Sequence, residues 1–283
     1  MTTESYAGRT VLITGANGAY GSRAAKEFAS RDTDTLVLVD LLDCTKLKQE
    51  IEADLGAGKK KPNLLVWQVD MMSYASCQEL GKKVRGLKSL DHCLMTAGIL
   101  AFNRRESPEG WETCERIVIY YLTPSDNGTA IQVNYISTAL LALLILPSLK
   151  ASPSNPNPPV MTFVTSFGIY PASPTLGAPR NGSYLKHLSN NKDGMAQAHQ
   201  YGRSKALLLY FARELAARVS AAGAKGKGMP QVTVNSADPG PAWTPLTQPN
   251  QAKLIPRLIQ NYGSRDVSQH PKVALIRTRT LLI

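Results

Sequence analysis

The stretch Thr-Gly-Ala-Asn-Gly-Ala-Tyr-Gly, residues 14–21, decides the fold of this chain. It follows a short apolar run, 10–14, and precedes the segment 22–30, whose apolar residues recur at helical spacing. The order is therefore strand, glycine-rich turn, helix. Small residues in such a turn let the backbone approach a pyrophosphate at the N-terminus of the helix, where free N–H groups favour anions. A plain turn remains the alternative.

Strands and helices alternate along most of the remaining chain. Short apolar runs predict strands at 35–39, 64–69, 91–95, 160–165 and 231–236, and helical spacing predicts helices at 44–55, 76–87, 131–149 and 201–222. Strands that are apolar throughout indicate a parallel sheet covered on both faces. We expect one α/β domain over residues 1–283, a Rossmann-type doubly wound sheet.

Three stretches interrupt this order. They are an apparent insertion at 114–130, a Pro-, Gly-, Ser- and Asn-rich stretch at 171–199, and a tail at 248–283 without a readable pattern. The second stretch is long for a simple connection, so we expect a loop over the substrate pocket. The first is either an inserted loop or a translated intron, because its codons can encode splice signals.

Composition and charge narrow the class of protein. Hydrophobic residues make up 43% and charged residues 19%, as in folded domains. The net charge of +11 permits nucleic-acid binding, but the basic residues are scattered, so we expect none. The apolar run 139–149 is about half the roughly 20 residues of a membrane span, so we expect no span. Dispersed cysteines and a polar start, 1–9, predict a cytoplasmic protein with reduced thiols.

Asp40 bears on the nucleotide that the turn would bind. It ends the second strand, close to the roughly 20-residue offset at which a carboxylate bonds the ribose hydroxyls of a dinucleotide. A carboxylate there repels a 2′-phosphate, and Leu41 and Leu42 follow it instead of Arg or Lys. The sequence therefore favours NAD over NADP. A helix-capping aspartate is the alternative.

Tyr201 and Lys205 are four residues apart, so a helix places both side chains on one face. A free tyrosine has a pKa of about 10, and a nearby ammonium favours its phenolate. Such a pair can exchange a proton with an alcohol or a carbonyl. Alone it is a weak signal, since helices offer such pairs by chance.

The order of several motifs along the chain strengthens the interpretation of Tyr201 and Lys205 as a proton-transfer pair. These are TGANGAYG, Val69-Asp70, Ala97-Gly98, Asn134 in VNYIST, Ser166 in VTSFG, YGRSK at 201–205, and Pro239-Gly240. Over about residues 8–247 the chain resembles the short-chain dehydrogenase/reductase family, and within it the retinol-dehydrogenase-like and fungal secondary-metabolite reductases. Two positions depart from the family pattern: Ala19 replaces its second glycine, and Thr96 replaces the asparagine before Ala-Gly.

The resemblance implies roles for individual residues. The catalytic set would be Ser166, Tyr201, Lys205 and Asn134, with no metal. The residues that bind NAD or NADP would be Gly15, Asn17, Tyr20, Gly21, Asp40, Asp70, Ala97, Gly98, Tyr201, Lys205, Pro239, Gly240 and Thr244. Asp70 would bind adenine, and Pro239-Gly240 with Thr244 would hold the nicotinamide end. Ala19 should weaken binding without abolishing it.

The resemblance also implies an activity and an assembly. We expect an NAD(P)-dependent oxidoreductase that interconverts a small alcohol and ketone, in a homodimer or homotetramer built on helices such as 201–222. Histidines 187 and 199 would be loop residues rather than bases. The alternative is a nucleotide-binding pseudoenzyme, or a defective product with a retained intron and an altered C-terminus.

Overall fold

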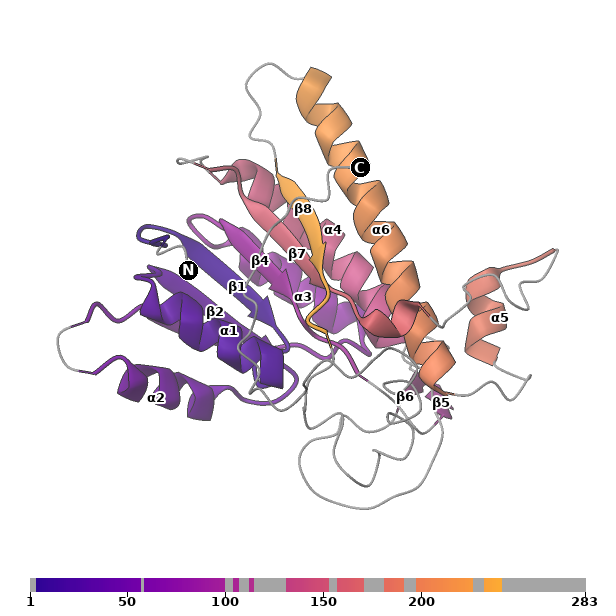
Figure 1. Ribbon diagram of the computed structural model, residues 1–283, viewed down its shortest axis with the longest axis horizontal. Helices are drawn as coiled ribbons and strands as arrows, with labels where there is room; N and C mark the ends of the chain where they lie inside the picture. The colour runs from indigo at the N-terminus through magenta and orange to yellow at the C-terminus, as the bar shows by residue number, and fades with distance from the viewer. Residues whose placement is uncertain are drawn as a thin grey trace.

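The computed structural model describes residues 4–56, 59–99, 104–106, 112–114, 131–152, 157–170, 181–190, 197–225 and 232–240 (Figure 1). The strands are β1 (Thr10–Thr14), β2 (Thr35–Asp40), β3 (Asn63–Gln68), β4 (His92–Met95), β5 (Arg104–Glu106), β6 (Glu112–Cys114), β7 (Val160–Val164) and β8 (Thr233–Ala237). The helices are α1 (Ala19–Ser30), α2 (Thr45–Asp54), α3 (Tyr74–Arg85), η1 (Gln132–Ser137), α4 (Thr138–Ala151), η2 (Phe167–Ile169), α5 (Tyr184–Asn190) and α6 (Gln197–Lys225).

Six of the strands form one sheet in the order β3-β2-β1-β4-β7-β8, and every neighbouring pair is parallel. The chain moves outward from β1 through β2 to β3, then returns to the other side of β1 with β4. The reversal lies between β1 and β4, so the connections leaving their carboxyl ends diverge there. In doubly wound sheets this is where ligands bind. The predicted fold class is confirmed.

Helices cover the sheet in two layers, as Figure 1 shows. Side chains alternate along β1, so Leu12 packs into a core with α3, α4 and α6, while Ile13 packs into a second core with α1 and α2. Both side chains are fully buried. Burial on both faces explains why the strands lack the alternation of apolar and polar residues that a half-exposed sheet shows.

Two helices show how the sequence fixes their starts. Ser73 caps α3 with its hydroxyl, which accepts a hydrogen bond from the Ser76 N–H, and three basic residues fill the last turn. By contrast, α1 begins after Gly18, which has no side chain to cap the helix, and its first turn holds no acidic residue. The N–H groups at the start of α1 therefore remain available to an anion.

The structure differs from the sequence expectations in three places. Between β4 and α4, where the sequence predicts no strand, lies an antiparallel pair, β5 with β6. The loop 171–199 contains α5, so His187 lies on a helix and not in a loop. Helix α6 begins at Gln197 and not at Tyr201, which makes His199 helical as well. Short polar segments escape a reading based on apolar periodicity. Residues 115–130 and the tail 248–283 lie outside the described residues.

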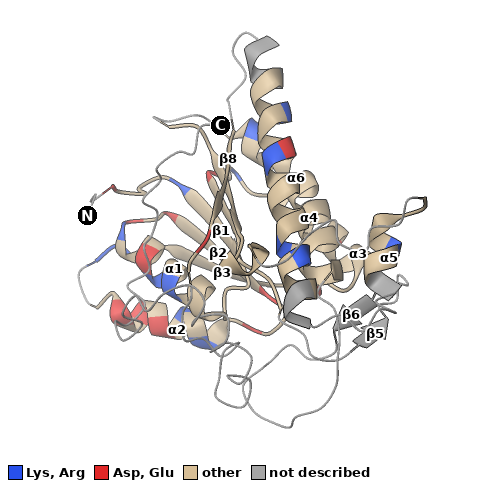
Figure 2. Ribbon diagram, turned by 45° about the vertical axis from the view of Figure 1, so that its right-hand side comes forward, with Lys and Arg blue, Asp and Glu red and all other residues tan. Residues whose placement is uncertain are grey.

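Charge and apolarity are both spread over the fold. Lys and Arg occur on α1, α2 and α6, and acidic residues are interleaved with them on α1 and α2 (Figure 2). Among the described residues one helical stretch, Gln132–Ala151, is long and apolar enough to cross a membrane, with a mean hydropathy of 1.5 and half of its apolar window buried. Its buried side chains belong to the core with α3 and α6. The absence of a membrane span stays a prediction.

Gly21 provides a test of the turn that begins α1. A Cβ at this position would overlap the carbonyl oxygen of Gly15 and lie 2.9 Å from the Ala16 Cα, and neither is the end of a flexible side chain. We expect Gly21→Ala to lower the free energy of unfolding by about 1–3 kcal/mol, as overpacking does. Urea denaturation measures this.

Gly86→Ala is the matched control, because Gly86 has an ordinary φ of −81° and the nearest atom to its added Cβ is the Lys83 carbonyl oxygen at 3.3 Å. Its effect should remain within about 1 kcal/mol. Equal stabilities for the two variants would show that the turn is not as tight as described.

Candidate active site

The glycine-rich turn lies against the end of β4. Gly15 has a φ of +66°, which favours glycine, and an added Cβ would lie 2.8 Å from both the backbone nitrogen and the Cα of Ala97. The turn therefore holds two strand ends in direct backbone contact. A side chain at Gly15 would overlap the backbone of Ala97, and one at Gly21 would overlap that of Gly15 and Ala16, so both glycines are needed for this tight turn into the uncapped N-terminus of α1, the glycine cradle. Free N–H groups at such a terminus suit the diphosphate of a dinucleotide, and binding of one here stays a prediction.

Asp40 lies beside this cradle at the carboxyl end of β2. One carboxylate oxygen accepts a hydrogen bond from the Asn17 backbone N–H at 2.9 Å, and the other accepts one from the Leu42 N–H at 3.3 Å. Burial raises the pKa of Asp40, and these backbone donors lower it. A carboxylate offers about four lone-pair sites, so two bonds leave capacity for ribose hydroxyls.

Asn17 and Asp70 complete the predicted adenosine side. The Asn17 amide donates to the carbonyls of Leu42 and Asp43, each at 3.3 Å, and so holds the β2 exit against the turn. Asp70 follows β3, the neighbour of β2, and its carboxylate accepts from the Met72 N–H at 2.8 Å. Both residues lie on the carboxyl edge of the sheet, next to Asp40.

Thr96, one of the two departures from the family pattern, has a clear structural role. Its hydroxyl donates to the carbonyl of Thr14, and the Thr14 hydroxyl in turn accepts from the Ala97 N–H at 3.2 Å. The two threonines thus join the ends of β1 and β4. The other departure, Ala19, is exposed. Its expected effect on cofactor affinity stays a prediction.

Asn134 connects β4 to α6. It is fully buried, and its amide oxygen accepts from the Ile99 N–H at 2.7 Å. Its amide nitrogen donates to the Ile99 carbonyl at 2.9 Å and to the Ser204 hydroxyl at 3.0 Å. Asn134 lies in the wide π-type turn η1, a conformation that often marks functional sites. All three polar contacts of the amide are used to fix the floor of the site.

Tyr201 and Ser166 meet where α6 passes the end of β7. Tyr201 is half-buried and its phenol is hydrogen-bonded to the Ser166 side chain. Ser166 itself is 9% exposed, and its hydroxyl accepts from the Gly168 N–H at 3.2 Å. Burial raises the pKa of Tyr201, the bond with Ser166 lowers it, and the carboxylate of Asp238 raises it. The phenol therefore holds its proton at neutral pH.

Lys205 is almost completely buried, with 3% of the residue exposed. Its ammonium donates to the Val164 carbonyl at 2.9 Å, and burial lowers its pKa to about 8. A methyl group at Gly98 would lie 3.0 Å from the Lys205 Nζ and 3.2 Å from the Asn134 Oδ1. The backbone at Gly98 thus lies close to both polar groups, and only glycine leaves that space open.

The other predicted residues lie around this centre. Tyr20, the second residue of α1, donates its hydroxyl to the Gly240 carbonyl at 3.3 Å. Pro239 precedes Gly240 at the carboxyl end of β8 and is exposed. Thr244 lies outside the described residues. Every other predicted site residue is therefore found on one edge of the sheet, between the α1 turn and α6.

Sequence reasoning missed two residues at this edge. Ser204 accepts from Asn134 and donates to the Tyr201 carbonyl at 2.7 Å, so it links the two. Asp238 accepts from the Gly240 N–H at 2.9 Å and raises the pKa of both Tyr20 and Tyr201. Ser204 lies three residues after Tyr201, and Asp238 lies two residues after a predicted strand, just before Pro-Gly. These spacings could have indicated from the sequence that both residues lie near the site.

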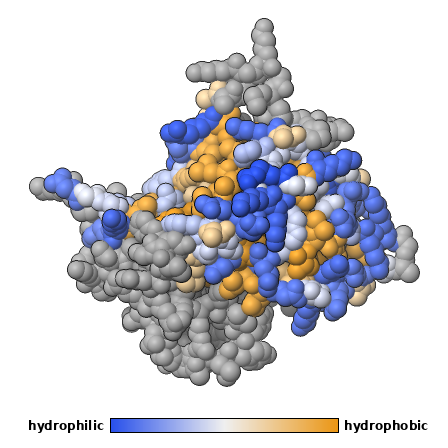
Figure 3. Space-filling model, turned by 180° about the vertical axis from the view of Figure 1, so that it is seen from behind, coloured by the Kyte–Doolittle hydropathy of each residue, from blue (hydrophilic) through white to orange (hydrophobic). Residues whose placement is uncertain are grey.

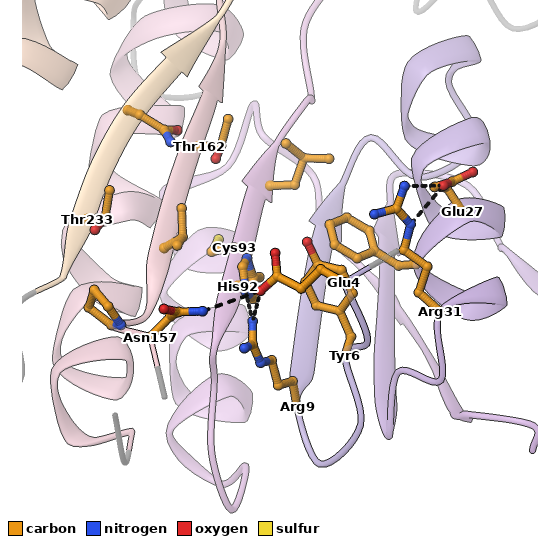
Figure 4. A pocket seen from close by; sticks show the side chains of 15 residues that line it. Glu4, Tyr6, Arg9, Glu27, Arg31, His92, Cys93, Asn157, Thr162 and Thr233 are labelled. Carbon is orange, nitrogen blue, oxygen red and sulfur yellow. Dashed lines mark hydrogen bonds and ion pairs between the residues drawn. The ribbon is translucent and has the colours of Figure 1, made fainter. Parts of the chain in front are cut away.

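A hollow of about 280 Å³ lies at the opposite, amino edge of the sheet (Figure 4). Its charges are paired, since Arg9 contacts Glu4 at 3.4 Å and Arg31 contacts Glu27 at 2.5 Å. Burial, and then Arg9, lower the pKa of His92 there to about 4, so its ring is neutral. This hollow lies away from the Tyr201 centre, and its paired charges give no chemistry comparable to it.

Comparison with known proteins agrees with this geometry. Residues 9–155 match the family model described as short chain dehydrogenase. The short-chain dehydrogenase/reductase ffsI of Aspergillus flavipes is 31% identical and phmF of Phaeosphaeria nodorum 32% identical, each over 84% of this chain. The chain spans 63% of the length of each of these two relatives.

Solved structures show the same fold. A short chain dehydrogenase from Salmonella enterica superposes with a TM-score of 0.57 at 18% identity, over 96% of each chain. The Pseudomonas aeruginosa RhlG/NADP active-site complex gives 0.57 at 20% identity, over 89% of this chain and 82% of that one. At such identities the likeness shows the fold alone. Together with the family match and the fungal relatives, it leads to one conclusion: this chain belongs to the short-chain dehydrogenase family.

Proposed function

We propose that the protein is an NAD(P)-dependent oxidoreductase that interconverts an alcohol and a carbonyl compound by hydride transfer. One observation carries the proposal: the hydrogen-bonded pair of Tyr201 and Ser166 shares the carboxyl edge of the sheet with the buried Lys205 and the glycine cradle. A proton-transfer group and a dinucleotide cradle at one edge are what this reaction requires.

The side chains of the site account for the proton transfer. When bound, the nicotinamide donates the hydride in reduction and accepts it in oxidation. In reduction Tyr201 gives its phenolic proton to the carbonyl oxygen of the substrate, while the Ser166 hydroxyl donates a hydrogen bond to the same oxygen. In oxidation the Tyr201 phenolate takes the proton back from the alcohol. The proton held on Tyr201 in the ligand-free protein suits the reductive half of this cycle.

Lys205 and Asn134 support Tyr201. Lys205 lies one helical turn after Tyr201, so its ammonium favours the phenolate through opposite charge. It also lies beside Gly98, where it is placed to hold the nicotinamide ribose. Asn134 fixes the backbone of Ile99 and the Ser204 hydroxyl, and so keeps the β4 exit and α6 in register. We also propose that Asn134 holds a water molecule that relays protons between Lys205 and solvent.

The cofactor preference follows from Asp40. Its carboxylate keeps a negative charge next to the adenosine side of the cradle, where it favours ribose hydroxyls and repels a 2′-phosphate. The described neighbours Leu41 and Leu42 offer no cation to compensate. We therefore propose NAD over NADP.

The proposal extends to the substrate and the assembly. We propose a small or medium apolar alcohol or ketone of secondary metabolism, converted in the cytoplasm, because the sequence motifs resemble those of fungal secondary-metabolite reductases. Leu143 on α4 and Tyr210 on α6 are 51% and 50% exposed, and apolar surface is visible on the face opposite α1 and α2 (Figure 3). Exposed apolar side chains on adjacent helices favour a homodimer or homotetramer.

Titration with NADH and NADPH, followed by nicotinamide fluorescence, tests the cofactor proposal. We expect tighter binding of NADH. Asp40→Asn keeps the size of the side chain and removes its charge, so it should narrow the difference between the two nucleotides by about tenfold, which corresponds to about 1.4 kcal/mol. Tighter NADPH binding by the wild-type protein would reverse the assignment. Failure to bind either nucleotide would favour the defective product.

Replacing Tyr201 tests the catalytic proposal. Tyr201→Phe removes the proton donor and keeps the ring, so turnover of NADH with a panel of apolar ketones should fall on the order of 10²–10⁴-fold while NADH affinity changes little. Tyr210→Phe, on the exposed side of the same helix, is the control and should retain full activity. Near-normal turnover by Tyr201→Phe contradicts the mechanism. Nucleotide binding by a wild-type protein that turns over no ketone or alcohol would favour the pseudoenzyme.

A further inference from the structure

Tyr20 joins two distant parts of the chain across the active-site edge. Its hydroxyl donates to the Gly240 carbonyl at 3.3 Å, although the two residues are 220 positions apart. Tyr20 belongs to the helix that follows β1, whereas Gly240 follows β8, and β4 and β7 lie between these strands in the sheet. Strands are spaced about 4.8 Å apart, so this link passes over roughly 14 Å of the carboxyl edge. The catalytic residues lie on that edge.

Asp238 sets the conformation of the far end of this link. Its carboxylate accepts from the Gly240 N–H at 2.9 Å, and Gly240 has a φ of +70°, which favours glycine. The carboxylate therefore closes a tight turn at the β8 exit. The Gly240 carbonyl accepts from Tyr20, so the positions of Asp238 and Tyr20 are connected through one residue, Gly240.

The phenol of Tyr20 lies beside the β8 exit and is partly buried. Burial, followed by Tyr201 and then Asp238, raises its pKa to about 12. Asp238 also raises the pKa of Tyr201. Gly240 contacts both Tyr20 and Asp238, because its carbonyl accepts from the Tyr20 hydroxyl and its N–H donates to the Asp238 carboxylate. Tyr20 holds its proton at neutral pH and acts there as a hydrogen-bond donor.

We propose that Tyr20, Gly240 and Asp238 form a clasp that closes the nicotinamide end of the dinucleotide cleft. Tyr20 contacts the cofactor, and Asp238 is a positioning residue that acts through Gly240. The inference rests on the proposed function for the identity of the ligand. The clasp itself concerns contacts within this chain. It assigns Asp238 a role in retaining the cofactor and in setting the protonation of Tyr201.

Binding measurements without turnover test the clasp. Loss of one hydrogen bond, as in Tyr20→Phe, should raise the Kd of NADH about three- to tenfold. AMP, which carries only the adenosine half of the dinucleotide, should bind the variant and the wild-type protein equally. Tyr6→Phe removes a tyrosine hydroxyl at the opposite edge of the sheet and serves as the control. An NADH affinity unchanged by Tyr20→Phe, or an equal loss of AMP affinity, would overturn the proposal.

Two substitutions of Asp238 separate its roles. Asp238→Ala removes the acceptor of the Gly240 N–H and should weaken NADH binding as much as Tyr20→Phe does. The double variant should bind no more weakly than either single variant, because both break the same link. Asp238→Asn keeps an acceptor oxygen and should restore NADH binding. Additive losses in the double variant would contradict a shared clasp.

The pH profile of Asp238→Asn provides a second readout. The charged group that acts on Tyr201 is Asp238 after β8, beside the neutral hydroxyls of Ser166 and Tyr20. Lys205 lies one helical turn further along the same helix. Removing the carboxylate lowers the pKa of Tyr201, so more phenolate exists at a given pH. Alcohol oxidation, which needs the phenolate, should therefore rise at a lower pH than in the wild-type protein. An unmoved profile would exclude this role of Asp238.

Hydrogen exchange of the ligand-free protein distinguishes the clasp from the proposed function. The Gly240 amide should exchange about tenfold faster in Asp238→Ala, since the hydrogen bond that protects it is lost. Unchanged exchange would overturn the clasp even if NADH binds normally. Faster exchange together with a wild-type protein that binds neither nucleotide would overturn the proposed function and the assigned ligand, and would leave the internal link established.

Discussion

The structure depends on the backbone contact between Gly15 and Ala97. The turn out of β1 and the end of β4 approach each other so closely that a single methyl group at Gly15 would overlap backbone atoms. This contact lies where the strand order reverses, so the segments that follow β1 and β4 leave the sheet in opposite directions. The hydrogen bonds that Thr96 and Ala97 donate to Thr14 keep the two strand ends together. Cradle, ribose site and catalytic centre are all placed relative to this junction.

A buried positive charge is the second constraint on the site. The Lys205 ammonium is desolvated, and its described hydrogen-bond partner is the Val164 carbonyl. Burial therefore lowers its pKa to about 8. A nearby anion would lower the cost of keeping the ammonium charged. The Tyr201 phenolate is such an anion, one helical turn away. Deprotonation of Tyr201 and protonation of Lys205 therefore favour each other, which makes the pair suitable for repeated proton transfer.

The sequence predicted the sheet and most of the site because its signals are local. Apolar runs that alternate with segments of helical spacing predicted the strands in order. The four-residue offset of Tyr201 and Lys205 predicted that both lie on one face of a helix. Sequence alone did not predict α5 or the pair of β5 and β6, because these elements are short and polar. It also missed the functions of Thr96 and Asp238. The hydrogen bond of Thr96 reaches Thr14, which becomes its neighbour only after the sheet has formed. That of Asp238 is local, but its link to Tyr20 through Gly240 depends on the folded sheet.

Tyr201 lies in a field with opposing contributions, and their balance bears on the direction of the reaction. Burial and the Asp238 carboxylate favour the protonated phenol, while the hydrogen bond with Ser166 favours the phenolate. The raised pKa shows that the first group prevails in the ligand-free protein. In the proposed reaction the protonated phenol is the form that donates to a carbonyl oxygen, so the ligand-free site suits the reductive direction. Asp238 therefore shifts the protonation equilibrium of Tyr201 towards the phenol. Its effect is opposite to that of the Lys205 ammonium, which favours the phenolate.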